Sequence, residues 1–115
     1  MRRKIVAGNW KMHKNAEETE DLLNDLIDKL PHDKGVEIIV APTFVNLASA
    51  VQHLEFTNIE VAAQNMHQAE SGAYTGEISA DMLRSIGVHT VILGRSERRT
   101  HFGETDSIIG YKVDT

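Results

Sequence analysis

The sequence contains no cysteine, and this absence excludes several kinds of chemistry at once. A 115-residue chain without cysteine forms no disulfide, holds no metal through thiolates and has no cysteine nucleophile. Only 2 residues are proline, and no part of the chain has the biased composition of a linker or a low-complexity tract. The whole of residues 1–115 is therefore expected to form one domain.

Long apolar runs and excess positive charge are also missing. No stretch approaches the roughly 20 apolar residues that a membrane span requires. Met1 leads through a few basic residues straight into a strand-like segment, without the long apolar region of a signal peptide, which predicts a cytoplasmic protein. The net charge of −5 argues against nucleic acid or an anionic membrane as a partner.

Four short apolar segments rich in β-branched residues recur along the chain. Their apolar residues do not alternate strictly with polar ones, which is typical of parallel strands covered on both faces. The predicted strands are Ile5–Gly8, Val36–Ala41, Ile59–Ala63 and Thr90–Gly94.

Helical patterns separate these strands. Asn15 and Glu18 have the spacing of a capping box, and an apolar stripe follows them before Pro31. The stripe consists of Leu22, Leu23, Leu26, Ile27 and Leu30. Further helices are expected over Asn46–Leu54, between Ser79 and Gly87, and from Thr105 into a stub that is incomplete at Thr115.

The alternation of strands and helices predicts a parallel sheet with right-handed crossovers. Periodicity alone does not separate a doubly wound sheet from part of a barrel, although no GxGxxG follows the first strand. One connection, from Gln64 to Ile78, is unusually long and lacks a core pattern. A connection of that length in a compact domain is typical of a functional loop or an interaction arm, and a flexible surface loop is the alternative.

Polar residues follow the first and fourth strands, at the end of a parallel sheet where active sites lie. Asn9 and Lys11 form a candidate anion-binding pair, and Arg95, Arg98 and Arg99 add positive charge to the same rim. A solvated loop is the ordinary interpretation of either segment alone. Glu97 is placed to hold one of these cations by a charge-assisted hydrogen bond. The 6 histidines contain no close ligand pair, so no metal site is predicted.

Taken together and in order, these segments resemble the triosephosphate isomerase family. Each short motif is weak alone, but the ordered set from Met1 to about Asp106 is specific. The motifs that carry the resemblance are Ala7–Met12, Ala41–Thr43, Ala63–Met66, Gly72–Ala80, Ser96–Arg99 and Phe102–Glu104. Proteins of this family are (β/α)8 barrels of about 250 residues. The resemblance therefore implies a parallel (β/α)4 half of a TIM barrel, truncated in the fourth helix.

The resemblance also implies residue roles. Asn9 and Lys11 match the family's substrate-binding pair, and Ser96 and Glu97 match residues that support the site. Gln64 to Glu77 match the arm that enters a neighbouring subunit of a homodimer. Within this arm Tyr74, Thr75 and Gly76 are expected at the interface, and Thr75 would help complete the partner's site. The implied reaction is the glycolytic interconversion of dihydroxyacetone phosphate and glyceraldehyde 3-phosphate, which needs no cofactor.

The sequence departs from the family pattern in two places. Arg95 occupies the position of the catalytic histidine, and a guanidinium stays protonated where an imidazole exchanges a proton. The glutamate base belongs to the part of the barrel that this sequence does not cover. Whether this chain is an enzyme is thus open: the alternatives to an isomerase are a self-associating, non-catalytic half-barrel and a weak phosphate-binding module.

Overall fold

The computed structural model describes residues 2–30 and 35–115. It contains one sheet of four parallel strands in the order β1-β2-β3-β4, so neighbours in sequence are neighbours in the sheet. The order never reverses, as it would at the switch point of a doubly wound sheet. The predicted fold class, a parallel (β/α)4 half of a TIM barrel, is confirmed. The strands are β1 (Lys4–Asn9), β2 (Val36–Ala41), β3 (Ile59–Ala63) and β4 (Thr90–Val91).

The strand predictions were accurate for β2 and β3 and less so at the two edges. β1 is longer than predicted by one residue at each end and pairs with β2 from Lys4 opposite Val36 to Asn9 opposite Ala41. β4 is shorter, because regular pairing with β3 ends at Val91. Gly94 then takes a φ of +69°, a left-handed conformation that turns the chain out of the strand.

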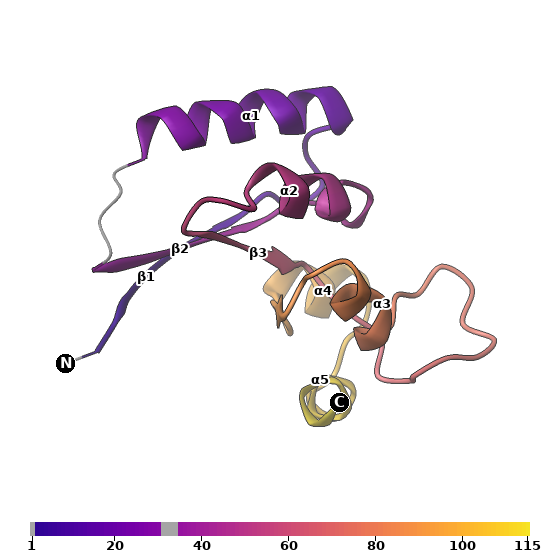
Figure 1. The fold of residues 1–115 in the computed structure, drawn as a ribbon. Helices are drawn as coiled ribbons and strands as arrows, with labels where there is room; N and C mark the ends of the chain where they lie inside the picture. Colours follow the sequence, from indigo (N-terminus) through magenta and orange to yellow (C-terminus); the bar gives the residue numbers. More distant parts are fainter. Residues whose placement is uncertain (1, 31–34) are drawn as a thin grey trace.

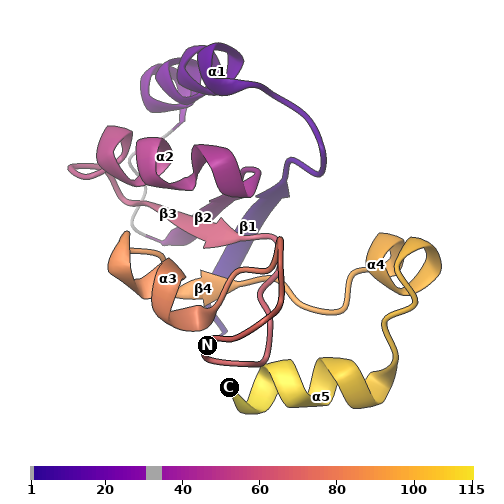
Figure 2. The same ribbon diagram turned by 90° about the vertical axis from the view of Figure 1, so that its right-hand side faces the viewer.

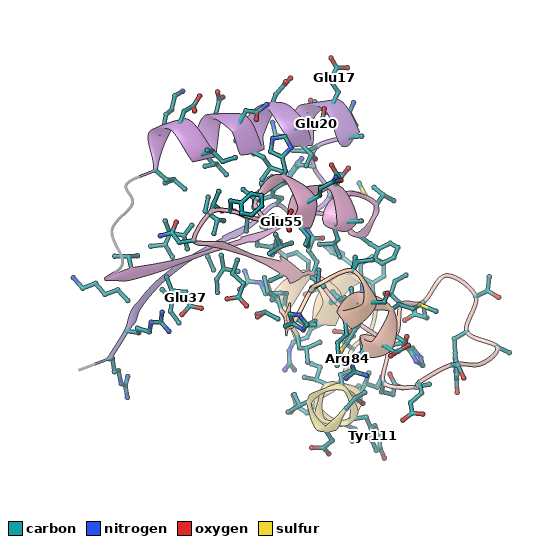
Figure 3. The ribbon with its side chains drawn as sticks, in the orientation of Figure 1. Glu17, Glu20, Glu37, Glu55, Arg84 and Tyr111 are labelled. Carbon is teal, nitrogen blue, oxygen red and sulfur yellow. The ribbon has the colours of Figure 1, made fainter. Side chains whose placement is uncertain are left out.

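The first two helices lie on one face of the sheet (Figure 1). α1 (Ala16–Lys29) begins with the predicted capping box, in which Asn15 and Glu18 exchange side-chain and backbone hydrogen bonds. Glu17 projects from its outer side (Figure 3), while Leu23 is fully buried beneath it. Pro31, predicted to follow this helix, lies outside the described residues. The next elements are the 3-10 turn η1 (Phe44–Asn46) and the helix α2 (Leu47–His53).

The remaining helices correct the sequence prediction in part. α3 (Ala80–Ser85) lies within the predicted range between Ser79 and Gly87, and the Ser79 side chain caps it. The charged run after β4, interpreted as a turn, forms a helix of its own, α4 (Ser96–His101). The expected stub is a nine-residue helix, α5 (Asp106–Asp114), capped by Thr105. Figure 2 shows α4 and α5 following β4 on the side away from α1.

The buried core lies between the sheet and its helices. A fully buried leucine stabilises the fold by about 2 kcal/mol relative to exposure. The buried cluster comprises Leu23, Ile38, Val40, Leu47, Ala50, Leu54, Ile59, Val61, Ala63, Met66, Leu83 and Val88. No helix among the described residues is long and apolar enough to cross a membrane.

β1 contradicts the expectation that every strand is covered on both faces. Ile5 and Val6 are 57% and 61% exposed. Among the described residues β1 pairs only with β2 and β4 only with β3, so both edges of the sheet are open. In this chain, therefore, apolar strand residues that a closed barrel would cover face solvent.

Candidate functional site

The loop after β1 holds Lys11 in an uncommon backbone conformation. Its φ is +53°, which costs a non-glycine residue roughly 1–2 kcal/mol. Two side chains fix this conformation: Asn9 Oδ1 accepts from the Lys11 N–H at 2.9 Å, and Gln64 Nε2 donates to the Lys11 carbonyl at 2.8 Å. The same Gln64 amide donates to the Ala41 carbonyl at 2.8 Å. Gln64, predicted as an interface residue, thus ties together the ends of three strands.

The Lys11 side chain is oriented by Glu97, the second residue of α4. Lys11 Nζ lies 2.8 Å from Glu97 Oε1, and both side chains are partly exposed. The hydrogen bond from Lys11 is the main reason that the pKa of Glu97 lies below its ordinary value. Glu97 is therefore ionised at neutral pH. The sequence indicated that Glu97 would hold a nearby cation, and the structure identifies that cation as Lys11.

These residues border a cavity of about 600 Å³ at the carboxyl ends of the strands. This volume falls within the usual range for small-molecule sites, about 300–1,000 Å³. Polar groups from three strand ends and from the arm share the wall with apolar side chains. The lining residues that matter below are Asn9, Lys11, Phe44, Gln64, Glu77, Arg95, Glu97, Arg98 and Phe102.

Arg95, at the position implied for the catalytic histidine, also lines this cavity. It is the N-cap residue of α4, its side chain is exposed, and within residues 2–30 and 35–115 its guanidinium makes no hydrogen bond or ion pair. The other arginines of the run are engaged: Arg98 Nε donates to Glu104 at 2.9 Å, and Arg99 Nη1 donates to Asp106 at 2.6 Å. Arg99 does not line the cavity, so of the four cations expected at this rim only Lys11, Arg95 and Arg98 border it.

Ser96 and the arm from Gln64 to Glu77 differ in whether they border the cavity. Ser96 is exposed as the first residue of α4 and is not part of the cavity wall. The arm makes a long excursion from the body of the molecule (Figure 1), and its Gly76 and Glu77 border the cavity. Tyr74 packs on the His67 ring at a centroid distance of 4.3 Å. Thr75 is exposed and lies outside the wall.

A buried charged cluster beneath the site was missed by the sequence analysis. The side chains of Glu104 and Lys112 are each 4% exposed, and their ion pair spans 2.5 Å. Arg98 Nε donates to the same Glu104 oxygen, and Lys112 Nζ also donates to Asn65 Oδ1 at 2.9 Å. Burial opposes ionisation of Glu104, but these hydrogen bonds outweigh it and lower its pKa. The cluster anchors α5 to the loop after β3, and the charge pattern of α5 alone gave no signal for it.

In the described part of the chain, no three histidine, aspartate or glutamate side chains gather as a metal site would require. His67 accepts a hydrogen bond from the Ala69 N–H through Nδ1, and His53 bonds to Asn24 across α1 and α2. These two histidines therefore contribute to packing between segments rather than to the cavity.

Comparison with known proteins supports the family resemblance that the sequence motifs indicated. The family model described as triosephosphate isomerase matches residues 4–115. Over all 115 residues the chain is 77% identical to triosephosphate isomerase of Flavobacterium psychrophilum and 67% identical to that of Flavobacterium johnsoniae, covering 46% of the length of each. It is 51% identical to the Alkaliphilus oremlandii protein of the same name over 98% of this chain and 45% of that protein. The chain thus spans about half the length of these relatives, and it belongs to the triosephosphate isomerase family.

Proposed function

We propose that the cavity at the strand ends is the substrate-binding half of a triosephosphate isomerase site in a cytoplasmic protein. Asn9 and Lys11 would bind the triose phosphate, with Glu97 holding the Lys11 side chain in place. For Ser96, which lies outside the cavity wall, only the family resemblance supports a role at the site. The observation that carries the proposal is the strained, doubly hydrogen-bonded Lys11 backbone, whose side chain is held at the cavity by Glu97. Strain of this kind persists where the surroundings enforce it, and such positions cluster at functional sites.

The chemistry of the reaction limits what this chain does alone. Isomerisation moves a proton between adjacent carbons, so it needs a carboxylate base and a group that donates a proton to the oxygen and takes it back. General acid–base catalysis supplies about 10²–10⁴-fold per positioned group. The family's base lies beyond the half-barrel covered here, and Arg95 cannot shuttle a proton because guanidinium does not deprotonate in proteins. Glu97, already paired with Lys11, is a poor substitute. The 115-residue chain is therefore proposed to bind without isomerising.

A coupled assay with dihydroxyacetone phosphate tests this proposal. The chain and its Arg95→His variant are both expected at background, because restoring the imidazole provides no base opposite it. A Lys11→Ala variant and a mock purification from the same host control for contaminating isomerase. Turnover that scales with the concentration of the chain and disappears in Lys11→Ala would refute the proposal that it is inactive alone.

We further propose that the chain self-associates as a homodimer, a role that does not require catalysis. Both sheet edges are open, and Ile5 and Val6 are more than half exposed. Unpaired edges invite pairing with another chain, and exposed apolar surface favours association. The arm adds Tyr74, while Phe102 exposes 68% of its surface beside the cavity.

Sedimentation equilibrium at micromolar concentration tests this assembly. A dimer is expected, and a Tyr74→Ser, Gly76→Asp double variant of the arm should weaken it, whereas Arg84→Ser on α3 should not. A compact, folded monomer at the same concentration would refute the homodimer.

A further inference from the structure

We infer that Asn46 is a positioning residue of the cavity: its buried amide holds the loop of residues 10–15, and through this loop it keeps Lys11 directed at Glu97. Asn46 does not itself line the cavity, so it acts through Lys11. The inference rests on the proposed function, because Lys11 is the residue proposed to bind the triose phosphate. It goes further by assigning the position of that lysine to a residue outside the motifs that carry the family resemblance.

The loop of residues 10–15 contains two residues in a left-handed conformation. Lys11 has a φ of +53° and Lys14 has a φ of +76°, and every other described residue with a positive φ is a glycine. This conformation is unfavourable for a residue with a Cβ atom, so it persists only where contacts enforce it. Between the two, Met12 is 90% exposed and His13 is exposed, so burial of these side chains does not fix the loop.

Side-chain amides from two neighbouring strand ends hold these two residues. Gln64, directly after β3, donates to the Lys11 carbonyl at 2.8 Å, and Asn46 Nδ2 donates to the Lys14 carbonyl at 3.0 Å. Asn46 ends η1, which follows β2, and lies 32 residues from Lys14 in the sequence. The loop after β1 is therefore held at both ends by segments that follow other strands of the sheet.

The surroundings of Asn46 fit this role. Asn46 is 2% exposed, whereas the adjacent Val45 is 82% exposed. A buried amide is costly unless its N–H groups are paired, and the same Asn46 nitrogen also donates to Thr43 Oγ1 at 3.0 Å. Because a carbonyl oxygen only accepts hydrogen bonds, a side chain without a donor at position 46 would leave the Lys14 carbonyl without this contact.

The Lys11–Glu97 pair reports on the loop without any ligand. Lys11 Nζ lies 2.8 Å from Glu97 Oε1, and this hydrogen bond is the main reason that the pKa of Glu97 lies below its ordinary value. Releasing the loop at Lys14 reduces the time that Lys11 spends in this position, so the pKa of Glu97 should rise toward its ordinary value. A loss of stability alone would leave the pKa of Glu97 in the folded protein unchanged.

Carbon-13 NMR titration of the side-chain carboxyls of the complete chain measures this pKa. In Asn46→Leu, which keeps the approximate size of the side chain but has no donor, the pKa of Glu97 should be higher than in the wild type. Asn46→Ser, whose hydroxyl ends one atom short of the amide nitrogen, should show the same rise and serves if the leucine variant does not fold. The affinity for inorganic phosphate at low salt should fall about two- to fivefold in both variants, as expected for the loss of one hydrogen bond that orders the site.

Two further variants assign the effect to the Lys14 contact. Asn58→Leu makes the same substitution in the exposed turn between α2 and β3, and it should change neither the pKa of Glu97 nor the affinity for phosphate. Adding Lys14→Gly to Asn46→Leu should lower the pKa of Glu97 back toward the wild-type value, because glycine adopts a positive φ without the steric penalty. Arg95 also lowers the pKa of Glu97, to a smaller extent, and all of these variants leave Arg95 in place.

An unchanged pKa of Glu97 in the folded Asn46→Leu or Asn46→Ser variant would overturn the inference and leave the proposed function intact. An equal rise in Asn58→Leu, or no recovery on adding Lys14→Gly, would overturn it as well. If the wild type bound neither phosphate nor dihydroxyacetone phosphate, the proposed function would fail, while the titration of Glu97 would still decide whether Asn46 positions Lys11.

Discussion

Replacing Glu104 by glutamine tests whether the buried charged cluster holds α5 to the barrel. The substitution keeps the shape of the side chain but removes its charge, and it leaves the Lys112 ammonium, 4% exposed, with the Asn65 amide oxygen as its strongest partner. Breaking a buried ion pair by removing one member costs about 3–5 kcal/mol. Domains of this size are stable by only about 5–15 kcal/mol, so the loss is a large share of the total.

Urea unfolding followed by fluorescence measures this loss directly, because Trp10 is the single tryptophan and packs against the core. With slopes of about 1–3 kcal/mol per molar urea, a loss of about 3–5 kcal/mol should lower the midpoint of unfolding by roughly 1–5 M. Arg84→Met, which breaks the exposed pair with Asp81 at 3.6 Å, should cost no more than about 1 kcal/mol.

A double-variant cycle separates the ion pair from general disturbance of the core. Lys112→Met removes the ammonium, so adding it to Glu104→Gln leaves no uncompensated buried lysine. The double variant should therefore be more stable than the sum of the single losses predicts, by about 1–3 kcal/mol. If the losses in free energy of unfolding of the two single variants simply added in the double variant, the proposed ion-pair contribution would be refuted. A loss in Glu104→Gln as small as that in Arg84→Met would refute it as well.

Two further predictions concern pH and the Lys11 loop. The pKa of Glu104 is lowered in the folded state, so its contribution to stability is present above the unfolded pKa of about 4.3 and is lost as pH falls through the folded pKa. The difference in free energy of unfolding between wild type and Glu104→Gln, measured in urea, should therefore narrow below about pH 4. A difference that widened there would contradict the lowered pKa. Gln64→Ala removes the hydrogen bonds to the Lys11 and Ala41 carbonyls and should lower the free energy of unfolding in urea by about 1–3 kcal/mol. The control Gln52→Ala, on the exposed side of α2, should change it by no more than about 0.5 kcal/mol. Equal losses in the two variants would show that the two Gln64 hydrogen bonds do not stabilise the fold.

The parts of the fold that follow from local sequence were predictable. The Asn15–Glu18 capping box needs only a spacing of three residues, and both of its hydrogen bonds form. The strands β2 and β3 are rich in β-branched residues, and their bounds match the prediction. The approach of Lys11 to Glu97 was indicated because parallel strands end at the same edge of a sheet.

What the sequence analysis missed depends on contacts between distant segments. α4 has no buried residue, so its sequence lacks the apolar stripe by which a helix is recognised. Lys112 is buried because Glu104 and Asn65 receive its ammonium, and a lysine in a helix otherwise indicates a solvated face. The exposure of Ile5 and Val6 depends on which segments cover β1, and their own composition predicts a covered strand.

The site combines a family-like framework with altered chemistry at one position. Asn9, Gln64 and Glu97 hold Lys11 by contacts that do not involve Arg95, and Arg95 caps α4 through its backbone alone. A change of side chain at position 95 therefore alters what the cavity presents to a ligand without loosening the residues that form it. The same independence makes the Arg95→His variant informative, since a change in its activity reports on the side chain at position 95 itself.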